Sequence, residues 1–121
     1  MSAGSLDAAA RDVLRRYPSA LQPTALIALG NHGGFSGARL WRVESTAGSL
    51  CLRAWPPGDP TPRRLDFLHR LMTSARTAGL AFVPTVFLTT DRSSWVDRVG
   101  RLWELTQWLP GQAGCARPGP G

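Results

Sequence analysis

The stretch that decides the fold is Gly30-Asn31-His32-Gly33-Gly34-Phe35-Ser36-Gly37, in which four of eight residues are glycine. An apolar run, Ala25 to Leu29, precedes it, and a strand-like segment, Ala38 to Ser45, follows it. Glycine permits positive φ and lets backbone N–H groups come close to a phosphate. The pattern therefore predicts a strand–turn–strand unit that covers a phosphate. On this segment alone, a hairpin turn without a ligand remains the simpler interpretation.

Other phosphate-binding motifs do not fit this stretch. The spacing is not that of the P-loop, and the sequence contains no lysine to complete one. A strand, not a helix, is predicted after Gly37, which argues against a dinucleotide-binding fingerprint. The remaining form is the strand–loop–strand arrangement in which a glycine-rich loop covers ATP.

Two helices are expected outside this unit. Apolar residues at helical spacing predict one from Ser5 to Tyr17, and Pro18 ends it. A longer helix begins at Pro62 with Thr61 as its N-cap and ends before Gly79. The spacing assigns its apolar face to Leu65, Leu68, Leu71, Met72 and Ala75.

Further strands are predicted on both sides of the longer helix. Ser49 to Trp55 follows the turn Ala47-Gly48, and the later strands are Thr85 to Thr90, Ser94 to Val99 and Arg101 to Trp108. The fold class is α+β, with an antiparallel sheet of about five strands. The Gly/Pro-rich residues 112–121 are expected to be a disordered tail.

Composition limits the classes of protein that fit. A chain of 121 residues allows one small domain and excludes a large multidomain enzyme. No window approaches the roughly 18 apolar residues of a membrane span, and the N-terminus lacks the features of a secretory signal. We therefore expect a cytoplasmic protein with no membrane partner. Cys51 and Cys115 have no metal-ligand spacing, so no metal site is predicted.

The net charge of +6 raises the hypothesis of nucleic-acid binding. All 14 basic residues are arginine, but they are scattered and form no run of five or more, and GC-rich coding also explains this usage. Five tryptophans could stack on bases if they shared a sheet face with arginine. Strand alternation puts Arg53 with Trp55 but Arg42 opposite Trp41, so nucleic acid is the less favoured partner.

Four segments together resemble the N-terminal lobe of the aminoglycoside phosphotransferase family, kinase-like enzymes that include choline and homoserine kinases. Residues 34–43 resemble the phosphate loop and second strand, and Leu50-Cys51-Leu52-Arg53 resembles the third strand. The helix from Pro62 to Ala78 has the position of the kinase C-helix. Residues 105–111 resemble the hinge, which commonly ends in a Trp-Leu-Pro-Gly-like sequence. The resemblance covers roughly residues 5–111.

The resemblance implies an ATP-binding lobe. Gly34 and Ser36 would lie against the phosphates, and Leu40 and Cys51 would line the adenine pocket. Alternatively, Leu40 and Cys51 have only a core role, because Leu40 is core-like in any hairpin and a cysteine is often a small buried hydrophobe.

The resemblance also implies that the backbone of Gln107 and Trp108 meets the hydrogen-bonding edge of adenine. Alternatively, Trp108 caps a hydrophobic cluster. Arg53 stands where the family has a lysine that binds the phosphates and pairs with a C-helix glutamate. An arginine at that position can bind phosphate bidentately or be a surface cation.

The chain departs from the family pattern in its acidic residues. The predicted helix has no glutamate, and its single acid, Asp66, is expected to form an exposed pair with Arg70. His32 and His69 have no evident carboxylate partner. The family's catalytic base and its carboxylates for Mg²⁺ belong to a C-terminal lobe, which this sequence lacks after Gly111.

The resulting hypothesis is the nucleotide-binding lobe of an ATP-dependent small-molecule phosphotransferase, as a truncated chain inactive alone. Catalytic residues and metal ligands are expected to be missing, and the acceptor would bind only with the C-terminal lobe supplied. Whether the chain is an enzyme stays open. The alternative is a non-enzymatic interaction module with exposed apolar surface near Trp103, Trp108 and Leu109.

Overall fold

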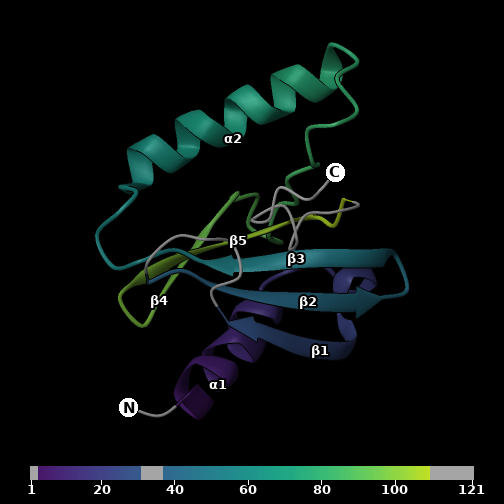
Figure 1. Cartoon of the computed structure of the whole chain (residues 1–121). Helices are drawn as coiled ribbons and strands as arrows, with labels where there is room; N and C mark the ends of the chain where they lie inside the picture. Colours follow the sequence, from purple (N-terminus) through teal and green to yellow (C-terminus); the bar gives the residue numbers. More distant parts are fainter. Residues whose placement is uncertain (1–2, 31–36, 110–121) are drawn as a thin grey trace, which may run out of the picture.

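The fold is a five-stranded antiparallel sheet with one helix on each face (Figure 1). A computed structural model describes residues 3–30 and 37–109. The elements are α1 (Ala3–Leu14), a short 3-10 helix (Ser19–Leu21), β1 (Pro23–Gly30), β2 (Arg39–Ser45), β3 (Gly48–Ala54), α2 (Pro62–Thr77), β4 (Val96–Arg98) and β5 (Arg101–Gln107). The strand order is β1-β2-β3-β5-β4, and every neighbouring pair is antiparallel. The predicted α+β class is confirmed.

The main hydrophobic core lies between α1 and one face of the sheet. Ala10, Val13 and Leu14 of α1 pack there with side chains that point from alternate positions of β2, β3 and β5. At its centre Trp41 and Trp103 stack, with ring centroids 5.3 Å apart. Both rings are buried, so they are unavailable for stacking on bases. Trp103 therefore does not contribute to the exposed apolar surface that the sequence predicts.

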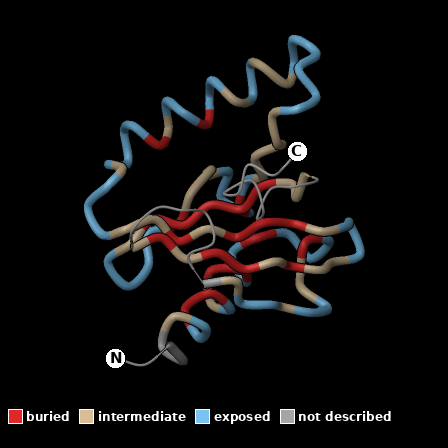
Figure 2. Tube along the Cα trace, viewed as in Figure 1, coloured by how far each residue is buried: buried red, intermediate tan, exposed pale blue. Residues whose placement is uncertain are grey.

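α2 lies over the opposite face (Figures 1 and 2), and its His69 contacts Glu104 of β5. It begins as predicted: the Thr61 side chain accepts a hydrogen bond from the backbone N–H of Arg64, and Pro62 is the first helical residue. Of its side chains only Leu65 and His69 are buried.

The prediction of the apolar face of α2 is wrong in part. Leu68 and Leu71 are exposed, and Met72 and Ala75 are half-buried. The sheet face opposite α2 carries the ion pair of Arg53 and Glu104, and Glu104 contacts His69 of the helix where a row of leucines was expected. Helical spacing alone could not reveal that polar partner.

The predicted strands are confirmed except for Thr85 to Thr90. This segment makes a single bridge, between Val86 and Thr106. One edge of β5 has two neighbours. β4 pairs with residues 101–103 on that edge, so only the C-terminal end of β5 is left for the segment Thr85 to Thr90. The segment therefore runs extended beside β5 without forming a strand.

Some predictions fall outside the described residues. Gly34, Ser36 and His32 lie there, as does the predicted tail at 112–121. The N-terminal helix ends at Leu14, before the predicted end at Tyr17, although Tyr17 is still buried against the core. In the described part of the chain no helix is long and apolar enough to cross a membrane.

Candidate functional site

The sheet face under α2 gathers polar and apolar side chains from three strands. Register places Leu40 opposite Arg53, and Cys51 opposite Thr106, so these four residues point to the same face. Arg53 also lies opposite Glu104. The structure thus brings together Leu40, Cys51 and Arg53, three of the site residues that the sequence predicts.

The end of the glycine-rich stretch is anchored beside this face. Gly37 has φ +85°, and a Cβ built on it would lie 3.3 Å from the Cβ of Pro56, so both conformation and space favour glycine. Nη1 of Arg101 donates a hydrogen bond to the carbonyl oxygen of Gly37 at 2.5 Å. The chain therefore enters β2 from a fixed position against the segment that follows β3.

Arg53 belongs to a buried network that joins β3, β5, α2 and the segment before β4. Its Nη1 donates to Oε2 of Glu104 at 2.8 Å. The other carboxylate oxygen, Oε1, is 2.6 Å from Nε2 of His69, and Nδ1 of His69 is 2.7 Å from Oγ of Ser94. Glu104 and His69 side chains are each 3% exposed, whereas Arg53 is 19% exposed. The network therefore has one end in the interior and one end near solvent.

The carboxyl of Glu104 is held as a carboxylate. Burial raises its pKa, but the hydrogen bond from His69 and the charge of Arg53 together lower it by more than burial raises it. The pKa of Glu104 therefore lies below its usual range. A carboxylate only accepts hydrogen bonds, so Nε2–H of His69 donates to it. In the neutral imidazole Nδ1 then accepts from the hydroxyl of Ser94.

Arg53 keeps hydrogen-bonding capacity beyond this pair. Its guanidinium carbon lies 5.0 Å from the ring centroid of Trp55, a cation–π contact. Its Nε is buried and has no hydrogen-bond partner among the described residues. A guanidinium has five N–H donors in a fork that suits phosphate and carboxylate, and Glu104 engages one nitrogen of it.

Two expectations for acidic partners are wrong. Asp66 does not pair with Arg70; its Oδ1 accepts a hydrogen bond from the indole Nε1 of Trp95 at 2.8 Å. His69 does have a carboxylate partner, Glu104. Both partners lie 29 residues or more away along the chain, beyond the reach of a helix-periodicity argument.

The backbone at Gln107 and Trp108 is engaged within the chain. The N–H of Gln107 donates to the carbonyl of Thr85 at 2.9 Å, and the N–H of Trp108 donates to that of Ser49 at 3.1 Å. The guanidinium carbon of Arg42 lies 4.9 Å from the centroid of the Trp108 ring. Contact of these two residues with a base stays a prediction.

Sequence reasoning missed Glu104 and Ser94. A signal for Glu104 was present: it is a lone carboxylate in Leu102-Trp103-Glu104-Leu105, and alternation along that strand puts it on the face of Arg53. No local signal marks Ser94. Within residues 3–30 and 37–109, no group of three or more His, Cys, Asp or Glu side chains could hold a metal ion.

Comparison with known proteins gives a likeness of fold. No family model matches the sequence, and no curated protein sequence matches it. Among solved structures, the chain is similar to the crystal structure of an aminoglycoside phosphotransferase from Alicyclobacillus acidocaldarius subsp. acidocaldarius DSM 446, with a TM-score of 0.55 and 13% identity. The match covers 81% of this chain and 26% of that one, so this chain spans about a quarter of that structure's length. At this identity the likeness concerns the fold alone.

Proposed function

We propose that the chain is a nucleotide-binding lobe of the kinase-like type, which binds ATP on the sheet face under α2. The observation that carries the proposal is Arg53, a cation that Glu104 holds through one nitrogen and whose side chain is 19% exposed. The similarity of fold to an aminoglycoside phosphotransferase supports this reading.

The Glu104–His69 pair fixes the position of Arg53. Because Glu104 receives a hydrogen bond from His69 on α2, the carboxylate that holds Arg53 is itself fixed to two elements. A cation held in place loses less side-chain freedom on binding an anion than a mobile surface arginine does.

The base would lie on the same face, over Leu40 and Cys51, which point to the side of the sheet that Arg53 occupies. Each of the two is 1% exposed, so a base would contact them only where the side chains that cover them move aside. Transfer of a phosphoryl group also needs a base for the acceptor hydroxyl and carboxylates for Mg²⁺, which the described residues do not provide as a cluster. We therefore assign nucleotide binding to these residues, and phosphoryl transfer to a small-molecule hydroxyl would require a second lobe.

Calorimetric titration with ATP and with adenosine tests the proposal. If Arg53 contacts phosphate, Arg53→Ala weakens ATP binding about tenfold or more and leaves adenosine binding unchanged, because a charge-assisted bidentate contact is lost. Arg53→Lys, which keeps the charge, should lose less. The matched control is Arg98→Ala, which removes an exposed arginine paired with Asp12 near α1.

Equal affinities of ATP for the native chain and Arg53→Ala would remove this arginine from the site. No preference for ATP over adenosine in the native chain would contradict phosphate recognition altogether. Circular dichroism of each variant confirms that the fold is retained.

A further inference from the structure

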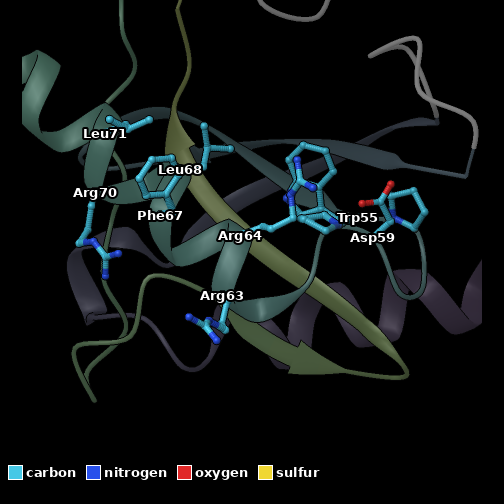
Figure 3. A pocket seen from close by; sticks show the side chains of 10 residues that line it. Trp55, Asp59, Arg63, Arg64, Phe67, Leu68, Arg70 and Leu71 are labelled. Carbon is cyan, nitrogen blue, oxygen red and sulfur yellow. The ribbon is translucent and has the colours of Figure 1, made fainter.

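A groove runs along the exposed side of α2, and its lining includes Trp55, the cation–π partner of Arg53. It has a volume of about 880 Å³. One wall is the exposed side of the first three turns of α2, and the other is the segment after β3 with Trp55, Pro56 and Pro60 (Figure 3). Nothing in the nucleotide proposal uses this groove.

The helix wall of the groove carries a row of exposed apolar side chains. Phe67 is 57% exposed, Leu71 51% and Leu68 39%. These residues recur at helical spacing, the pattern that normally buries one face of a helix. The sheet does not cover them, since α2 turns His69 and Leu65 toward it. The helix therefore presents a second apolar stripe with no partner among the described residues.

Positive charge borders this stripe. Arg63, Arg64 and Arg70 line the groove and are exposed. None of them forms an ion pair with the described residues, whereas Arg53, Arg42 and Arg98 elsewhere each have a carboxylate partner. The groove has one acid in its lining, Asp59. By helical spacing, Arg63 and Arg70 flank Phe67 on the same side of α2.

We propose that this groove binds an acidic, amphipathic segment of a partner protein, with apolar side chains set against Phe67, Leu68 and Leu71 and carboxylates set against the arginines. A bare apolar stripe with unpaired cations is complementary to such a segment. A second copy of the chain is a poor occupant because each copy carries a net charge of +6. A lipid surface is a poorer fit than a protein segment, since the groove has two walls, one formed by α2 and the other by Trp55 and two prolines.

A designed peptide tests the proposal with the intact chain. The probe is an acetylated, amidated helical peptide of leucine, alanine and glutamate with its leucines on one face. Two control peptides replace every glutamate by glutamine or by lysine. We expect the glutamate peptide to bind more tightly than the glutamine peptide, and the lysine peptide not to bind.

Matched variants locate the binding surface. Phe67→Ala should weaken binding of the glutamate peptide about tenfold, as removal of an interface aromatic anchor does. Its control, Phe82→Ala, removes a phenylalanine that is 74% exposed and lies outside the groove. Arg70→Glu should weaken binding about fivefold. Its control, Arg11→Glu, makes the same change of charge on α1.

Several results would overturn the proposal. They are equal binding of the glutamate and glutamine peptides, equal loss in a variant and its control, or no binding of the glutamate peptide at all. Binding to vesicles of phosphatidylserine and phosphatidylcholine that Phe67→Ala and Arg70→Glu abolish, with no peptide binding, would assign the groove to membranes instead.

Discussion

The two helices lie against opposite faces of one sheet and are held there by different interactions. α1 packs Ala10, Val13 and Leu14 into a continuous apolar core around Trp103. α2 buries one leucine and one histidine, and that histidine meets a charged carboxylate. The α1 side is an ordinary hydrophobic core, whereas the α2 side is a short row of hydrogen bonds between charged and polar groups.

Because of this difference, one side of the sheet should stabilise the fold and the other should set the positions of Arg53 and α2. Apolar burial is non-directional and grows with area, so the α1 side should supply most of the free energy of folding. A hydrogen-bonded row is directional and stabilises one arrangement of its members, so the α2 side should fix where Arg53 and the helix lie. A polar attachment also leaves the apolar side of α2 uncovered, which is the feature that the groove proposal uses.

The largest expected effect is on the α1 side. Trp103→Ala removes a fully buried ring that stacks on Trp41 and donates from Nε1 to the carbonyl of Arg98 at 3.0 Å. We expect the free energy of unfolding to fall by about 4 kcal/mol. Leu68→Ala on α2 is the contrasting change and should cost below about 1 kcal/mol. Urea unfolding measures both, and similar losses would contradict the division between the faces.

Next in size is the loss of the buried charge on the α2 side. Glu104→Gln leaves the Arg53 guanidinium without its counter-charge, and we expect a loss of about 3 kcal/mol in the free energy of unfolding. The control is Glu44→Gln, which removes a more exposed carboxylate paired with Arg42 and should hardly move the unfolding midpoint. Equal effects of the two substitutions would show that burial does not distinguish these ion pairs.

The same carboxylate gives a smaller, pH-dependent effect. The pKa of Glu104 is lower in the folded chain than its ordinary value of 4.5, so its contribution to stability is complete above that pH. The contribution is lost as the pH falls below 4.5 and through the folded pKa. We expect the stability difference between the native chain and Glu104→Gln to shrink over that range. A difference that stays constant from pH 7 to pH 3 would contradict this assignment.

Sequence reasoning found the elements because their signals are local. Thr61-Pro62 starts α2 through a cap that the structure contains, and the Ala47-Gly48 turn joins β2 and β3 in register. Leu40, Cys51 and Arg53 were predicted as site residues through the family resemblance, and the strand register places them on one face of the sheet. The prediction of a strand from Thr85 to Thr90 was wrong because a strand needs a free edge to pair with, and β4 occupies part of the edge of β5.

The network around Glu104 was out of reach for a different reason. His69, Ser94 and Arg53 come from three separate segments, and their meeting depends on how α2 crosses the sheet. Helix periodicity favoured the leucines of α2 as the buried face because apolar spacing is the only signal a single helix provides. A charged residue on the opposing sheet face changed which side of the helix turned inward.

The smallest expected effect on stability concerns a hydroxyl that is buried on the α1 side of the sheet. The hydroxyl of Tyr17 is buried and has no hydrogen-bond partner among the described residues. Burial raises its pKa, and the charge of Glu104 adds to the rise, so the group stays neutral over the working pH range. A buried hydroxyl without a partner keeps its desolvation cost, so Tyr17→Phe should raise the free energy of unfolding by up to about 1 kcal/mol. Thermal unfolding measures the sign, and a clear loss of stability would show that the hydroxyl has a partner on the apolar side of the sheet.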